Sequence, residues 1–137
     1  MEKLTGGCQC GAVRYEADGP PVFAAHCQCV DCKRSSGAGH VTAAGFPESA
    51  VTFVGMTKSY VSRADSGANV SRAFCPECGG RLALRSETIP GMVLLMAGSL
   101  DDPTRITPEA AIFDTRHVAW DYFDPALPRV PGMPPRG

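Results

Sequence analysis

The chain has 137 residues, 20% of them charged, a size that fits one domain with a modest hydrophobic core. Its formal net charge of -1, with both signs interspersed, gives no electrostatic reason to expect nucleic acid as a partner. No apolar run is long enough to span a bilayer, and the first residues lack the apolar core of a signal peptide. We therefore expect a cytoplasmic protein, in which clustered cysteines indicate metal or redox chemistry rather than disulfides.

Short stretches rich in β-branched and aromatic residues, separated by glycine, proline and aspartate, follow one another along the chain. They predict strands at residues 12–17, 22–26, 40–45, 51–54, 58–62, 71–74, 81–85, 92–97 and 110–114. Val13 and Tyr15 alternate with Arg14 and Glu16, which is typical of a strand with one buried face. The best helix candidate is short, at residues 30–36. The predicted fold class is mainly β, a single domain of short antiparallel sheets with at most one or two short helices.

The end of the chain is rich in proline. Its prolines favour extended backbone with few hydrogen bonds and lie at positions 125, 128, 131, 134 and 135. We therefore expect a folded domain at residues 1–124 and a proline-rich arm on the surface at residues 125–137.

Seven cysteines fall in three clusters, which are Cys8 and Cys10, then Cys27, Cys29 and Cys32, then Cys75 and Cys78. An odd total argues against a complete disulfide framework. Zinc closes a structural site with four protein ligands, whereas a catalytic site keeps one position open. Two pairs would complete one closed site, and the triple would bind a second ion with a vacancy.

The closed site begins with a zinc-knuckle type of sequence at residues 75–80. Two residues between Cys75 and Cys78 let both sulfurs face one ion, and the following glycines permit the turn. Cys8 and Cys10 are the natural partner pair, and joining the pairs closes a loop of about 65 residues, whose entropy cost grows slowly with length. The alternative is a redox-active Cys75/Cys78 pair, but the βαβ pattern typical of such pairs is missing.

The middle cluster leaves its fourth ligand open. Four side chains could complete a closed site: His26, Asp31, His40 or His117. His26 directly precedes Cys27, and adjacent side chains on extended backbone diverge. Three thiolates give a Zn²⁺ site a net charge of about -1, which suits a soft ligand such as a thiolate better than it suits hydrolysis. A bound thiolate is a nucleophile, and an aldehyde carbonyl is a matching electrophile.

Basic and aromatic residues offer candidate substrate contacts. Lys33 and Arg34 follow the middle cluster and form either a solvated basic surface or a site for the carboxylates of a small anionic thiol. Arg14 and Arg72 could add to such a site. Three aromatic residues near the end either pack in the core or line a cleft: Trp120, Tyr122 and Phe123.

Several stretches together carry a family resemblance: residues 7–15, 26–37, 74–79 and 97–101, followed by Trp120. They resemble the glutathione-dependent formaldehyde-activating family, also called the CENP-V/GFA domain. The resemblance implies a zinc-stabilised β-tent fold with two Zn²⁺ ions, one structural and one catalytic. It places Cys8, Cys10, Cys75 and Cys78 on the structural ion, and Cys27, Cys29 and Cys32 on the catalytic ion. Lys33 stands where the family commonly has an arginine.

The resemblance also implies an activity, that of a carbon–sulfur lyase that forms or cleaves S-(hydroxymethyl)glutathione. The partners would be a small-molecule thiol, such as glutathione as co-substrate, and an aldehyde such as formaldehyde. Two alternatives remain open. One is a non-catalytic zinc module that binds a protein partner, and the other is a thiol or metal sensor. The oligomeric state is open between monomer and homodimer.

Overall fold

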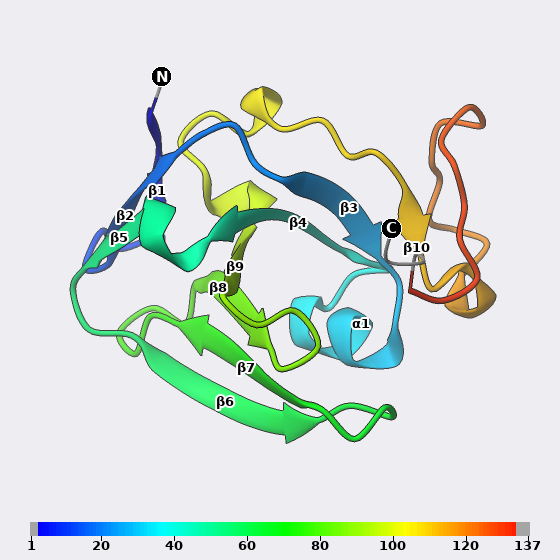
Figure 1. The fold of residues 1–137 in the computed structure, drawn as a ribbon, viewed down its shortest axis with the longest axis horizontal. Coiled ribbons are helices and arrows are strands. Elements are labelled where there is room, and N and C mark those ends of the chain that lie inside the picture. Colours follow the sequence, from blue (N-terminus) through cyan, green and yellow to red (C-terminus); the bar gives the residue numbers. More distant parts are fainter. Residues whose placement is uncertain (1–2, 134–137) are drawn as a thin grey trace.

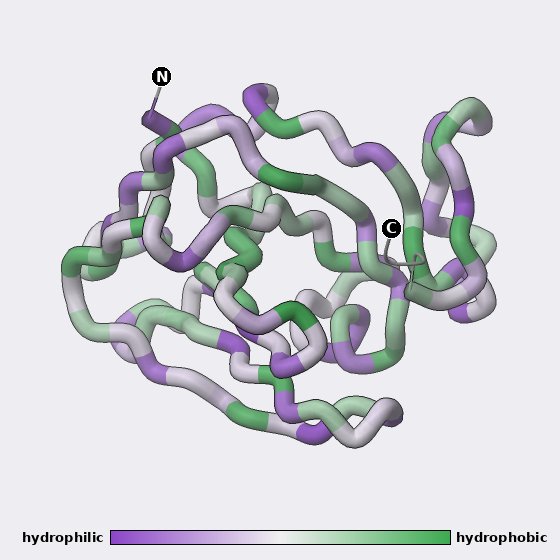
Figure 2. The backbone as a smooth tube through the Cα atoms, viewed as in Figure 1, coloured by the Kyte–Doolittle hydropathy of each residue, from purple (hydrophilic) through white to green (hydrophobic). Residues whose placement is uncertain are grey.

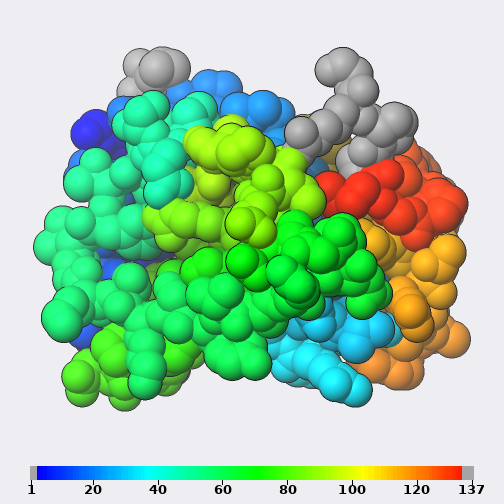
Figure 3. Space-filling model, turned by 60° about the horizontal axis from the view of Figure 1, so that its bottom comes forward, coloured from blue at the N-terminus to red at the C-terminus, as the bar shows by residue number. Residues whose placement is uncertain are grey.

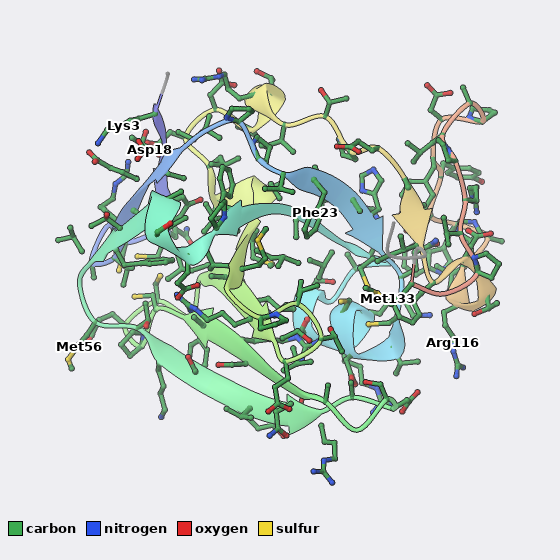
Figure 4. The ribbon with its side chains drawn as sticks, viewed as in Figure 1. Lys3, Asp18, Phe23, Met56, Arg116 and Met133 are labelled. Carbon is green, nitrogen blue, oxygen red and sulfur yellow. The ribbon has the colours of Figure 1, made fainter. Side chains whose placement is uncertain are left out.

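Two β-sheets build the protein in a computed structural model that describes residues 3–133 (Figure 1). The smaller sheet has three antiparallel strands in the order β1-β2-β5, with bounds β1 Lys3–Gly7, β2 Arg14–Asp18 and β5 Val51–Val54. Lys3 and Asp18 are paired at one end of this sheet (Figure 4). In β2 the exposed and buried residues alternate, as the sequence predicted.

The larger sheet has seven strands in the order β10-β3-β4-β9-β8-β7-β6. Its strands are β3 Phe23–Cys27, β4 Val41–Pro47, β6 Lys58–Arg63, β7 Asn69–Phe74, β8 Arg81–Ser86, β9 Met92–Met96 and β10 Ala111–Ile112. All its pairings are antiparallel except that between β10 and β3, which is parallel.

The main core lies between the two sheets. Val13 and Tyr15 from the β2 side are buried in one cluster with Phe46 of β4, Leu82 of β8 and Leu95 of β9. Hydrophobic stretches accordingly run along β3 and through the middle of the molecule (Figure 2). Full burial of a large apolar side chain contributes about 1.5–3 kcal/mol, so this cluster supplies much of the driving force for folding.

One α-helix occurs in the described part of the chain, α1 at Val30–Ser36. Cys29 is its N-cap, and Gly37 ends it in the left-handed conformation with φ 73°, where glycine is favoured. Short 3-10 turns lie at Glu48–Ala50, Ala97–Ser99, Pro103–Arg105 and Asp114–Arg116. No helix of the described residues is long and apolar enough to cross a membrane.

The predicted fold class is confirmed, with the helix at the expected residues. The sequence prediction missed β1, whose sequence KLTGG has two glycines and little strand character. The structure explains Gly6, because a Cβ there would lie 2.4 Å from the Tyr15 hydroxyl oxygen and 2.5 Å from the backbone oxygen of Ser99. Close packing against Tyr15 thus requires glycine at position 6. Because glycine has a low strand propensity, the sequence pattern did not indicate a strand here.

The C-terminal segment differs from the poorly hydrogen-bonded arm that we expected. Ala111 N–H donates to the Pro128 carbonyl at 2.9 Å, and Val130 N–H donates to the Ala111 carbonyl at 2.9 Å. Phe113 N–H likewise donates to Gly132 at 3.1 Å, so this segment adds to the sheet edge beside β10. It lies over the preceding part of the chain in Figure 3, red against orange. The division at residue 124 stays a prediction, and Pro134 and Pro135 lie outside the described residues.

Candidate metal centres

The first and last cysteine pairs meet, although more than sixty residues separate them. The four sulfurs lie within 4.8 Å of one another, with Sγ–Sγ distances of 3.7 Å between Cys8 and Cys10 and 3.8 Å between Cys10 and Cys75. A tetrahedral zinc with Zn–S bonds of about 2.3 Å separates its sulfurs by roughly 3.8 Å. These distances are far longer than a disulfide bond, and all the cysteines are free. The four-cysteine site, Cys8, Cys10, Cys75 and Cys78, therefore fits a tetrahedral metal ion.

Backbone N–H groups of two tight turns point at these sulfurs. Val13 N–H donates to Cys8 Sγ at 3.3 Å, and Gly80 N–H donates to Cys78 Sγ at 3.4 Å. The Val13 bond lowers the pKa of Cys8 to about 6, because it stabilises the thiolate. Gly11 and Gly79 end the turns with φ of 82° and 77°. The two turns thus favour the thiolate form of Cys8 and Cys78, the form that binds metal.

The four-cysteine site is part of the main core. Cys75 is fully buried within it, and Cys8 packs against it, whereas Cys10 and Cys78 are exposed. Gly80 would bring a Cβ within 3.2 Å of Cys8 Cβ, so the turns approach each other closely. A metal ion there would link the start of the chain to the β7–β8 turn.

The middle cysteines come together at the junction of β3 and α1. Cys27 ends β3, Cys29 caps α1, and Cys32 lies in the first turn of α1. Their sulfurs lie within 4.8 Å of one another, and Cys32 N–H donates to Cys29 Sγ at 3.3 Å. Cys32 is buried, and the other two are partly buried against it. We call this group the three-cysteine site.

No histidine, aspartate or glutamate joins this group within residues 3–133. Each histidine is instead hydrogen-bonded through Nδ1: His26 with Thr42 at 2.7 Å, His40 with Asp121 at 2.7 Å, and His117 with Gln28 at 2.6 Å. All three rings lie around Phe123, at centroid distances of 4.8, 5.0 and 5.8 Å respectively. Asp31 is exposed. The donor set of the three-cysteine site is thus three sulfurs.

Because the three sulfurs lie close together, the pKa values of Cys27 and Cys29 shift in opposite directions. The pKa of Cys29 is lowered because its sulfur accepts hydrogen bonds from the Cys27 and Cys32 thiols. The pKa of Cys27 is raised, chiefly by its hydrogen bond to the Cys29 sulfur. Metal binding requires thiolates, so a divalent cation would displace the protons that these sulfurs share. The donor set therefore fits a cation that prefers sulfur.

Gln28 fixes the loop that carries the three cysteines. It is fully buried, and its Nε2 donates to Asp114 Oδ1 at 3.1 Å while its Oε1 contacts His117 Nδ1 at 2.6 Å. Its backbone N–H donates to the Ile112 carbonyl at 3.1 Å. Arg129 of the C-terminal segment also donates to Asp114, at 2.7 Å. Sequence reasoning missed this role, because the same Cys-Gln-Cys pattern at Gln9 leaves that side chain exposed.

A cavity of about 510 Å³ borders the four-cysteine site, whereas Cys27, Cys29 and Cys32 do not line it. Cys8 contributes to one part of its wall, and Val41 and Met96, which pack with Cys32, contribute to another. His40 and Arg81 also line it. The cavity thus borders the apolar surroundings of the three-cysteine site and presents a histidine and an arginine.

His40 is held in the wall by Asp121. The two hydrogen-bonded side chains are 24% and 13% exposed, so their contact is shielded from most solvent. Gly39 makes room for it, since a Cβ there would lie 2.5 Å from Asp121 Oδ2. A carboxylate on Nδ1 fixes the tautomer with its proton at Nδ1, which leaves Nε2 as the basic nitrogen. Sequence reasoning could not pair these residues, which lie about eighty positions apart.

The predicted basic residues lie in three different places. Lys33 donates through Nζ to the Arg116 carbonyl at 2.8 Å, and Arg34 is exposed. The Arg116 side chain projects outward (Figure 4). Arg14 forms an ion pair with Asp101, with one N–O distance of 2.9 Å. None of Lys33, Arg34 and Arg14 lines the cavity.

Arg72 and Arg81 both interact electrostatically with the three-cysteine site. Arg72 is only 7% exposed, and its positive charge helps to lower the pKa of Cys29, after the sulfur hydrogen bonds. Arg81 lines the cavity and donates through Nη1 to the Ser35 carbonyl of α1 at 2.7 Å. The sequence singled out Arg72 without placing it and gave no signal for Arg81. Of the aromatic candidates, Phe123 packs on the histidines, whereas Trp120 and Tyr122 are exposed.

Comparisons with known proteins agree with this architecture. A crystal structure of a Rhodobacter sphaeroides protein is similar, with a TM-score of 0.57 and 22% identity over 76% of this chain and 91% of that one, which shows a shared fold. No curated protein matches the sequence. The profile of the family described as glutathione-dependent formaldehyde-activating enzyme matches residues 3–116. Since that match spans most of the chain, the protein belongs to the glutathione-dependent formaldehyde-activating enzyme family.

Proposed function

We propose that this protein is a zinc-dependent carbon–sulfur lyase that forms or cleaves a thiol–aldehyde adduct such as S-(hydroxymethyl)glutathione. The observation that carries the proposal is a three-sulfur site that no other protein ligand joins within the described residues. Val41 and Met96, which pack with Cys32, separate it from a cavity of about 510 Å³. Three protein ligands and an open position are typical of catalytic zinc. Family membership supports the same activity.

Zinc fits both cysteine sites, because thiolate donors suit it and the four-cysteine spacing matches its tetrahedral geometry. In the three-cysteine site, Cys27, Cys29 and Cys32 hold the ion and would be the catalytic ligands. Zinc bound there would coordinate a substrate thiol and keep it deprotonated near neutral pH. In the four-cysteine site, the ion is structural.

His40 is the proton carrier in this proposal. The reaction in the direction of cleavage turns a hydroxymethyl thioether into an aldehyde and a thiolate. The substrate hydroxyl gives its proton to His40 Nε2, the carbonyl forms, and the carbon–sulfur bond breaks with its electron pair going to sulfur. Asp121 stabilises the imidazolium that results. In the direction of formation, the same ring returns the proton to the oxygen as sulfur attacks the aldehyde.

The rest of the substrate would lie in the cavity and over the start of α1. Lys33 and Arg34 stay proposed contacts for the carboxylates of a thiol such as glutathione. Arg34 is the better placed of the two, because it is exposed while the Lys33 ammonium already binds the Arg116 carbonyl. Recognition by a solvent-exposed arginine predicts an increased KM, with little change in kcat, for Arg34→Gln.

Exchange NMR between formaldehyde and its glutathione adduct tests the activity, after subtraction of the spontaneous rate. The zinc-loaded protein should accelerate the exchange. Asp121→Asn should reduce the acceleration at least tenfold, since general acid–base catalysis contributes about 10²–10⁴. Asp124→Asn is a matched control, because this exposed carboxylate caps a turn at Ala126. A zinc-loaded protein that leaves the exchange at its spontaneous rate would refute the proposed function.

A further inference from the structure

Two arginines with buried side-chain nitrogens lack carboxylate partners next to the three-cysteine site. Arg72 Nη1 donates to Ser62 Oγ at 3.1 Å, but its Nε is buried without a hydrogen-bond partner. Arg81 Nη1 donates to the Ser35 carbonyl, and its Nη2 is likewise buried without a partner. Neither guanidinium forms an ion pair within residues 3–133. Buried charges are costly unless something compensates them, so this arrangement needs an explanation.

Both arginines lie next to the three-cysteine site, Arg72 by its strand register and Arg81 by its hydrogen bond to α1. Arg72 of β7 is paired across the sheet with Leu84 of β8, and paired residues share one face. Leu84 packs against the cluster that contains Cys32, so Arg72 lies on the side of the sheet that covers the three-cysteine site. Arg81 reaches from the start of β8 to the end of α1, the helix that carries Cys32.

The two guanidinium groups also affect each other. The pKa of Arg81 is lowered by its burial and then by repulsion from Arg72, whereas the Cys32 charge opposes this. Such a pair is stable only with negative charge nearby. The Cys32 sulfur interacts electrostatically with both arginines, and the Cys29 sulfur interacts with Arg72.

The net charge of a metal-loaded three-cysteine site does not balance the two arginines when the fourth ligand is neutral. Three thiolates and one divalent cation leave a single negative charge, which balances one of the two arginines. A fourth ligand that is neutral leaves the second arginine uncompensated. A fourth ligand that is a thiolate adds one more negative charge, and the site then balances both.

We propose that Arg72 and Arg81 form a charge-selecting pair, which makes the open position of the three-cysteine site bind an anionic thiolate in preference to a neutral ligand. The inference rests on the proposed metal site, and it names the charge state in which the substrate binds. The thiol gives its proton to the solvent on binding, and the pair compensates the charge that remains on sulfur. Arg72 and Arg81 are thus positioning residues that act through the field at the site.

The test uses Co²⁺ in the three-cysteine site and two small probe ligands. Cobalt absorption reports the fourth ligand directly, without any turnover. Titration with 2-mercaptoethanol measures thiolate binding, and titration with imidazole measures binding of a neutral ligand. Arg81→Gln and Arg72→Gln should each weaken thiolate binding about tenfold or more, the size of effect that one adjacent opposite charge has on proton binding, and leave imidazole binding within about twofold. Arg72→Lys, which keeps the charge, should retain most of the preference.

Arg85→Gln is the matched control, because Arg85 lies on the same strand as Arg81 but pairs with Glu48 at 2.7 Å. Equal weakening of both probe ligands in Arg81→Gln would mean that Arg81 merely supports α1, and the inference would be wrong. An unchanged thiolate affinity would also overturn it, while the open site and the proposed lyase would stand. If neither probe enters the wild-type site, the inference and the proposed function both fail. Should Arg72→Gln not fold, Arg81→Gln and Arg72→Lys decide the question.

Discussion

The two cysteine sites share a Cys-Gln-Cys pattern but place it in opposite surroundings. In the four-cysteine site Gln9 is exposed, and the sulfurs are held by the N–H groups of two tight turns. In the three-cysteine site Gln28 is fully buried and joins the loop to Asp114 and His117. The geometry of the four-cysteine site therefore depends on two turns and a fourth sulfur. In the three-cysteine site, the buried Gln28 side chain instead fixes the loop that carries the cysteines. We infer that the four-cysteine site serves the fold and the three-cysteine site keeps a position for a ligand.

Metal removal should separate the two sites most strongly. A weak chelator should first remove one ion with little change in secondary structure, because three protein ligands would hold it at the three-cysteine site and four would hold the other. A strong chelator should then remove the second ion and unfold the protein, since structural zinc can contribute about 10–16 kcal/mol of binding energy at neutral pH. Metal analysis together with circular dichroism during the titration measures both steps. Loss of both ions in one step, with unfolding, would remove the distinction between the sites.

Substitution of Gln28 should have the next largest effect on stability. Gln28→Ala should lower the free energy of unfolding by about 1–3 kcal/mol, because it leaves the buried partners of its side chain unsatisfied. It should also weaken metal retention at the three-cysteine site alone. Gln9→Ala is the matched control and should change stability by less than about 0.5 kcal/mol, as expected at an exposed position. Denaturant unfolding and metal analysis make the comparison, and similar losses in both variants would argue against a special role for Gln28.

A smaller effect concerns the exposed ion pair near the four-cysteine site. Arg14 and Thr5 bind Asp101 and lower the pKa of this carboxyl from 3.8 to about 2. Because the folded-state pKa is the lower one, the pair stabilises the protein above pH 4, and this contribution is lost as the pH falls toward 2. Asp101→Asn should remove that part of the acid dependence of unfolding, whereas Asp65→Asn, in an exposed turn, should not. Identical acid dependence of wild type and Asp101→Asn would show that the pair does not stabilise the fold.

The sequence predicted the strands and the cysteine groups because their signals are local. Alternation around Tyr15 and the two-residue spacing of Cys75 and Cys78 are complete within a few residues. The missed features depend on long-range contacts. Gly6 of β1 packs closely against Tyr15 of β2, and Asp121 contacts His40 from 81 positions away in the sequence. Arg81 follows a cysteine pair in sequence, but its role depends on the packing of α1 against β8.

A comparison of Cys78→Ser with Cys32→Ser tests most directly whether the four-cysteine site is structural and the three-cysteine site binds a ligand. Both variants lose one sulfur, one from each site, and their metal content and thermal unfolding can be measured side by side. Cys78→Ser should lose the structural ion and unfold at a much lower temperature. Cys32→Ser should lose only the other ion, remain folded and no longer bind thiol at its cobalt site. If Cys32→Ser unfolds as readily as Cys78→Ser, both sites serve the fold and the account is wrong.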